Sequence, residues 1–163
     1  MFLPFMNKIY IEMKFAWKYD QDQHWPYNGI VNDLYRSVQA EMNYATAQLL
    51  FNYSEFIGRK MLGTVGSWKK GDDIKAYREF TKKYVGYKDI SSKELEKIFN
   101  DCRNGLAHEY FVKGEYTAIM NDPGNLPCGI EKRGNNYTIY IHTYFNHFVH
   151  GLEHAIDEGV TTF

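Results

Sequence analysis

Apolar residues recur at helical spacing through the first two thirds of the chain. The clearest stripe lies within residues 30–62 and consists of Ile30, Leu34, Val38, Ala45, Leu49, Tyr53 and Phe56. Spacings of mostly three and four residues place such side chains on one face of an amphipathic helix. Asn43 is a suitable N-cap, so the pattern predicts two helices with a corner near 41–43, ending before Gly63.

Proline and glycine mark the breaks around this region. Residues 1–25 fit both a helical and a strand period, and we expect a helix there. The run 25–29 contains a proline, which disfavours helix at the residue before it, so we expect a break. After a glycine-bounded loop, Asp72 or Asp73 can cap a further helix that ends near Gly86.

Ser91 and Glu94 have the spacing of a capping box, in which each side chain satisfies the other residue's backbone N–H. They are expected to open a helix that leads into the segment starting at Arg103. The predicted buried face of this helix consists of Leu95, Ile98, Phe99, Cys102 and Leu106.

The hydrophobic period changes in the last third of the chain. Turn-forming residues occupy 121–125 and 134–136. Apolar and polar residues alternate over 137–142, which predicts a strand in a small β-hairpin near 116–142. A last helix is expected over about 143–158.

Composition places the chain among globular proteins. It has 163 residues, of which 44% are apolar and 24% charged, and it shows no repeat, low-complexity tract or linker. We therefore expect one mainly α-helical domain spanning 1–163. The 14 tyrosines and 11 phenylalanines should mostly lie in the core or at an interface.

The sequence lacks the features of several classes of protein, which we therefore do not expect. The start of the chain lacks a secretory signal, and no stretch approaches the roughly 20 apolar residues of a membrane span. The two cysteines form no CxxC pair or disulfide framework, so we expect a soluble, cytoplasmic protein. Neither GxGxxG, a Walker sequence nor GxSxG occurs, and we expect no cofactor and no resident metal.

The net charge of −1 argues against a protein that mainly coats nucleic acid, but one region is locally basic. Residues 58–83 contain eight lysines and arginines against three acidic residues. The candidates for phosphate binding are Lys69, Lys70, Lys75 and Arg78. A solvated helix face with an adjacent loop has the same composition, and both interpretations stay open.

The strongest candidate for a chemical site is the segment 103–111, RNGLAHEYF. It combines Arg103 and His108, separated by four residues, with Asn104 directly after the arginine and Tyr110 two residues after the histidine. No other arginine of the chain has a histidine five residues later. The combination is therefore specific enough to carry a hypothesis.

These side chains suit phosphodiester cleavage without metal. Histidine titrates near neutrality, so His108 can take a proton from an RNA 2′-hydroxyl or protonate the leaving oxygen. Arg103 offers a planar, permanently charged donor for a phosphate oxygen, and Asn104 can orient His108 at four-residue spacing. On an ideal helix Arg103 and His108 lie about 140° apart, so two chains facing each other across a twofold axis would combine them better than one.

The segment resembles the Arg-x4-His motif of the HEPN superfamily, in the Arg-x4-His-x-Tyr form of HEPN toxins paired with minimal nucleotidyltransferase antitoxins. The predicted helix over 45–58 is similar to the long second helix of many HEPN-like domains. The resemblance implies an up-and-down helical bundle, a homodimer, and metal-independent ribonuclease activity on an RNA substrate. It makes Arg103 and His108 catalytic, Asn104 their polar support, and Tyr110 the residue that a partner antitoxin modifies.

Three alternatives stay open. An arginine and a histidine near a helix end can simply satisfy backbone carbonyls and the helix dipole. A HEPN-like dimer can also be a non-catalytic module that binds RNA, a nucleotide or a protein. Zinc is a third possibility, since histidines share a face of the last helix. The residues concerned are His142, His147, His150, Glu153 and His154, with Cys128 as the spare thiol.

Overall fold

The computed structural model describes residues 25–67, 69–104, 116–120 and 129–160. Within these residues the protein is mainly helical, with five α-helices and a small three-stranded sheet. This confirms the expected mainly α architecture with a small β element. No helix in this part of the chain is long and apolar enough to cross a membrane.

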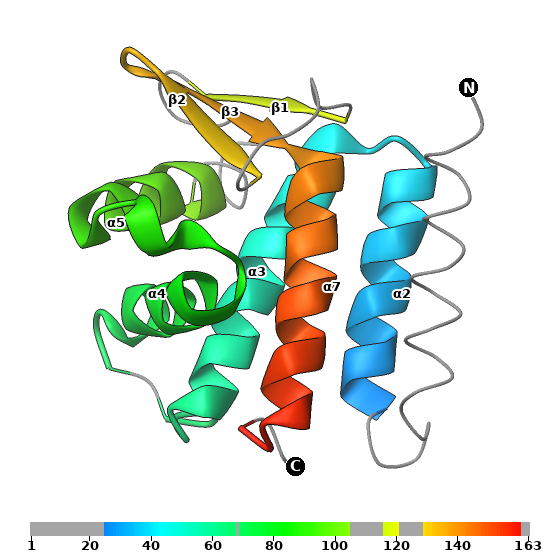
Figure 1. Cartoon of the computed structure of the whole chain (residues 1–163), viewed down its shortest axis with the longest axis vertical. Helices are drawn as coiled ribbons and strands as arrows, with labels where there is room; N and C mark the ends of the chain where they lie inside the picture. The colour runs from blue at the N-terminus through cyan, green and yellow to red at the C-terminus, as the bar shows by residue number, and fades with distance from the viewer. Residues whose placement is uncertain (1–24, 68, 105–115, 121–128, 161–163) are drawn as a thin grey trace.

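Three helices run along the long axis of the molecule (Figure 1). They are α2 (Trp25–Gln39), α3 (Asn43–Met61) and α7 (Ile141–Asp157). Each contacts the other two, and fully buried side chains such as Leu34 and Phe148 pack between them. The two helices predicted within residues 30–62, and the last helix, are thereby confirmed.

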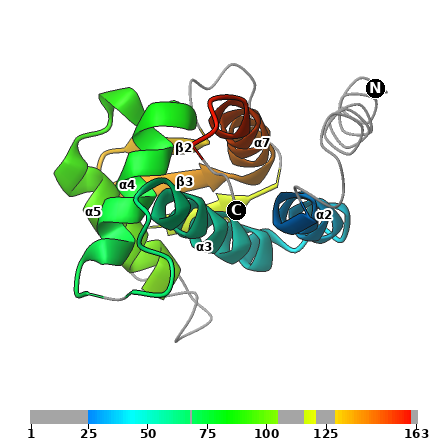
Figure 2. The same ribbon diagram turned by 90° about the horizontal axis from the view of Figure 1, so that it is seen from below.

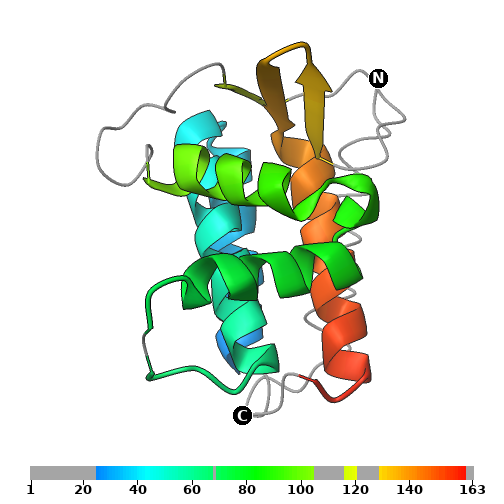
Figure 3. The same ribbon diagram turned by 90° about the vertical axis from the view of Figure 1, so that its left-hand side faces the viewer.

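Helices α4 (Asp72–Tyr84) and α5 (Ser92–Phe99) lie one above the other across the upright helices (Figure 3). Seen from below, they lie on the side of α3 that faces away from α2 (Figure 2). The 3₁₀ turn η1 (Tyr87–Asp89) joins them. Helix α5 continues without a break into η2 (Asn100–Asn104), a π-helical segment.

The capping box is confirmed. The Ser91 hydroxyl accepts a hydrogen bond from the backbone N–H of Glu94, at 3.2 Å, and donates one to the Glu94 carboxylate, at 2.9 Å. The predicted buried face of this helix is observed as well, since Leu95 and Cys102 are fully buried. Leu106 lies outside the described residues.

Other predicted helix starts are wrong in detail. Helix α2 begins at Trp25, where a break was expected, because a proline at the second helical position loses no hydrogen bond there. The N-cap of α3 is Met42; Asn43 instead donates to the carbonyl of Ala118 at 3.2 Å. The N-cap of α4 is Gly71, with φ of 90°, and Asp72 and Asp73 lie in the first turn instead, where Asp73 Oδ1 accepts a hydrogen bond from the backbone N–H of Ile74 at 2.9 Å.

The small sheet lies at one end of the upright helices (Figure 1). Strands β2 (Ile130–Arg133) and β3 (Asn136–Tyr140) form the expected hairpin, closed by a turn at Gly134. Strand β1 (Tyr116–Ile119) pairs with β3 in parallel, so β3 is the central strand. This parallel pairing was not predicted. Helix α7 follows β3 directly, which fixes the sheet to the helical core.

A cluster of buried hydroxyl groups joins four elements in the core. The Tyr144 hydroxyl lies 3.2 Å from that of Ser54 and 3.3 Å from that of Tyr77. The ring of Tyr87 packs against Tyr144 with centroids 5.6 Å apart. Burial raises the pKa of Tyr144 to about 12 and raises that of Tyr77 well above its ordinary value, so these phenols stay neutral near pH 7.

Candidate functional site

Arg103 lies in η2, at the end of the helix that the capping box opens. Its side chain is 30% exposed, and its guanidinium carbon lies 5.8 Å from the ring centre of Phe99. The aromatic ring supports the cation on one side. Arg103 therefore combines a fixed position with access to solvent, as a phosphate-binding arginine requires.

The carboxylate of Glu55 holds the guanidinium of Arg103. Arg103 Nη2 donates to Glu55 Oε2 at 3.4 Å, and Arg59 Nε donates to Glu55 Oε1 at 2.8 Å. Glu55 itself is buried in α3, with 8% of its surface exposed. One buried carboxylate thus faces two guanidinium groups, and its two oxygens are divided between them.

Sequence reasoning missed Glu55. Its four-residue spacing from Arg59 is visible in the sequence and indicates an ion pair on one helix face. Its pairing with Arg103 joins residues 48 positions apart, and only the packing of α3 against η2 brings them together.

The rest of the predicted motif is not placed. Asn104 is the last residue of η2, but its side chain, together with His108 and Tyr110, lies outside the described residues. The catalytic roles expected for Asn104 and His108 therefore remain predictions, as does the role of Tyr110.

The basic segment is connected to the Arg103 region. Arg59 Nη1 donates to the carbonyl of Ser67 at 3.3 Å, which ties the loop before α4 to the Glu55 cluster. The predicted phosphate-binding residues Lys69 and Lys70 lie in this loop and are exposed. On α4, Lys75 is exposed and Arg78 is half-buried.

The histidines of α7 do not converge in the structure. His147 Nδ1 lies 3.1 Å from the carbonyl of Val85, whereas His150 and His154 are exposed. His150 lies 3.8 Å from Glu153. Among the described residues no group of three or more histidine, cysteine, aspartate or glutamate side chains is placed to hold a metal ion.

Cys102 is a free, buried thiol. Burial raises its pKa well above the ordinary value, so the reactive thiolate is disfavoured. Its place in the fold is that of a small core residue, as the predicted buried face of α5 implied. Cys128 lies outside the described residues.

Comparison with models of protein families, with curated proteins and with solved structures finds no match to this chain. The resemblance to HEPN domains therefore rests on the residues of its motif. Function has to be argued from the site itself.

Proposed function

We propose that the protein is a metal-independent endoribonuclease with a HEPN-like fold. In this proposal two copies of the chain form a homodimer, and Arg103 of one copy and His108 of the other act on the same phosphate. Asn104 orients the imidazole. The proposal includes a role as a toxin or defence nuclease, with Tyr110 as the position that an antitoxin partner would modify.

The observation that carries the proposal is the setting of Arg103. A buried carboxylate and an aromatic ring hold its guanidinium while its side chain stays partly exposed. A donor that is already oriented can stabilise developing negative charge without reorganisation during the reaction. This is the property that phosphoryl chemistry needs from an arginine.

The reaction follows from the two side chains. His108 removes the proton of a ribose 2′-hydroxyl, whose oxygen attacks the adjacent phosphorus. The bond from phosphorus to the 5′-oxygen breaks, a protonated imidazole delivers a proton to that oxygen, and a 2′,3′-cyclic phosphate remains. Arg103 donates hydrogen bonds to the non-bridging oxygens, where charge increases in the transition state.

The exposed cations near this region suit the same substrate. Lys69, Lys70, Lys75 and Arg78 can attract phosphates of a bound strand, because exposed basic groups act on a polyanion without reading its sequence. We include them as substrate-binding residues. The tie from Arg59 to Ser67 links their loop to the carboxylate that holds Arg103.

The test is cleavage of a mixed-sequence RNA in the presence of EDTA, with analysis of the product ends. We expect 2′,3′-cyclic phosphate ends from the wild type. Arg103→Ala should lower the rate by about 100-fold or more, and His108→Ala by a similar factor.

Arg36→Ala and His154→Ala are matched controls, because both side chains are exposed and lie on other elements, α2 and α7. They should cleave like the wild type. Cleavage that survives both Arg103→Ala and His108→Ala would refute the proposed site. A folded wild type that binds RNA and leaves it intact would point instead to the non-catalytic binding module.

A further inference from the structure

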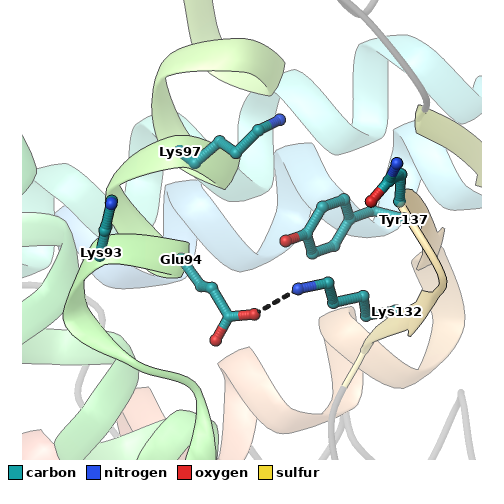
Figure 4. A pocket seen from close by; sticks show the side chains of 6 residues that line it. Lys93, Glu94, Lys97, Lys132 and Tyr137 are labelled. Atoms are coloured by element: carbon teal, nitrogen blue, oxygen red, sulfur yellow. Dashed lines mark hydrogen bonds and ion pairs between the residues drawn. The ribbon is translucent and has the colours of Figure 1, made fainter.

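A second charged region lies between α5 and the β2–β3 hairpin. A cleft of about 420 Å³ separates this helix from the β2–β3 hairpin (Figure 4). Its lining residues are Lys93, Glu94, Lys97, Lys132, Asn135 and Tyr137. The lining thus contains three lysines and one carboxylate, so it carries an excess of positive charge.

The charges of the cleft are only partly compensated. Lys132 Nζ lies 2.6 Å from Glu94 Oε1, and this contact lowers the pKa of Glu94 and raises that of Lys132. Lys97 Nζ lies 2.7 Å from Asp101, next to the cleft. Lys93 is exposed at the rim.

Two of the lysines contact an aromatic ring of the cleft. The ammonium groups of Lys97 and Lys132 lie 5.7 and 5.6 Å from the ring centre of Tyr137. Tyr137 stacks on Tyr116 with centroids 4.9 Å apart, and both rings are nearly buried. The rings hold the cations at the cleft by cation–π attraction, and cations held there can attract an anion.

The geometry points to a phosphate-binding cleft between α5 and the hairpin, and we propose that it holds a single-stranded RNA beside the scissile bond. The choice of RNA rests on the proposed function. Lysine ammonium groups bind phosphate as point charges, and the amide of Asn135 adds a neutral donor. Lys97 precedes Arg103 by six residues, about 9 Å along an α-helix axis, so a strand that follows the helix surface would pass from one to the other.

The experiment measures binding of a fluorescent 10-mer RNA that carries 2′-O-methyl groups and cannot be cleaved through the 2′-oxygen. Lys93→Gln and Lys132→Gln should each bind several-fold more weakly. Each should also reduce the slope of log affinity against log salt by about 0.7, the value for one lost single-strand phosphate contact. Arg36→Gln, the same charge change on the exposed face of α2, is the control and should bind like the wild type.

Glu94→Gln gives the opposite prediction. It removes the carboxylate that competes for Lys132, while glutamine still serves in the capping box with Ser91. We expect tighter binding of the 10-mer, a result that a purely structural role of the cleft would not produce. Unchanged or weaker binding by Glu94→Gln would overturn the proposal, as would lysine variants that bind like the wild type.

Separate arms identify the ligand and separate this proposal from the nuclease. Lysine-dependent binding of pyrophosphate without binding of the 10-mer would assign the cleft to a small phosphate and overturn the RNA assignment. Equal lysine-dependent binding of a ten-residue polyglutamate would overturn it in favour of acidic peptides. Lysine-dependent RNA binding without any cleavage would support the RNA-binding cleft and refute the nuclease. Cleavage of RNA, together with lysine variants that bind RNA like the wild type, would support the nuclease and refute the cleft.

Discussion

Arg59 and Arg103 share one acidic partner, Glu55. Glu55 therefore contributes both to stability and to the orientation of Arg103. Burying a carboxylate costs several kcal/mol, which the two guanidinium groups offset through direct hydrogen bonds. Removing the charge of Glu55 takes the carboxylate away from both guanidinium groups. Because Arg103 is the partly exposed member, it is the one whose orientation should loosen.

We predict that Glu55→Gln lowers both stability and cleavage. Glutamine keeps the shape and one acceptor oxygen, so the protein should fold but lose about 1–3 kcal/mol of its free energy of unfolding, the range for hydrogen bonds to charged groups. As a positioning residue for Arg103, Glu55 should affect kcat more than KM. Urea unfolding and steady-state cleavage measure the two effects.

Glu131→Gln is the matched control for this prediction. Glu131 also pairs with an arginine, the exposed Arg133, at 3.1 Å, and such surface pairs contribute little. It also accepts a hydrogen bond from the Tyr140 hydroxyl at 2.8 Å, which the amide oxygen of glutamine can still accept. Its replacement should leave unfolding and kcat nearly unchanged. If Glu55→Gln behaves like Glu131→Gln, the carboxylate does not hold Arg103 in a functionally important position.

The sequence pattern identified Arg103 of this cluster but not its acidic partner Glu55. Arg103 is marked by its spacing to His108 and Tyr110, a short-range pattern that can be found without a structure. Glu55 looks like any acidic residue on a helix with an arginine four positions later. Its role depends on a contact between distant segments, and no local signal reports such a contact.

At the scale of elements, the crossing of α3 and α4 places the basic loop next to the Glu55 cluster. Gly58 makes this crossing possible. A Cβ atom at that position would lie 1.9 Å from the carbonyl oxygen of Ala76 in α4. Because the neighbour is backbone, the two helices would have to separate.

We predict that Gly58→Ala destabilises the protein by about 3 kcal/mol, the upper range for overpacking a core. Gly29→Ala is the control, because Gly29 is also helical and a Cβ there meets nothing within 4 Å. It should stabilise the protein by about 0.5–1 kcal/mol through the higher helix propensity of alanine. Thermal or urea unfolding of both variants checks the crossing; equal effects of the two substitutions would contradict it.

Elements defined by local chemistry were predicted, and those defined by distant pairing were not. The Ser91–Glu94 capping box and the turn at Gly134 act within a few residues, so their sequence signals suffice. Strand β1 pairs in parallel with β3 across intervening residues, and its four residues carry no signal for that partner. The start of α2 at Trp25 differs from the predicted break because Pro26 lies in the first turn of the helix, where proline is tolerated.

At the scale of the whole molecule, the net charge of −1 conceals an uneven distribution. Cations gather in the loop before α4, at the Glu55 cluster and in the cleft beneath the hairpin. Helices α4 and α5, which carry Lys75, Arg78, Lys93 and Lys97, lie on the same side of the upright helices (Figure 3). Local fields of this kind can attract a polyanion even when the protein as a whole is nearly neutral.

The dimer is the part of the account that matters most for catalysis. On an ideal helix one chain would present Arg103 and His108 about 140° apart, whereas the proposed isologous contact would supply each group from a different copy. If each site takes its arginine from one chain and its histidine from the other, two inactive variants can complement each other. A site built within one chain cannot be restored in this way.

The most direct test mixes Arg103→Ala and His108→Ala proteins, exchanges their subunits, and measures cleavage of RNA in EDTA. Each variant alone should be nearly inactive. Random exchange makes half of the dimers mixed, each with one intact composite site, so the mixture should recover about one quarter of wild-type activity. A mixture that exchanges subunits but stays as inactive as its components would contradict the composite site.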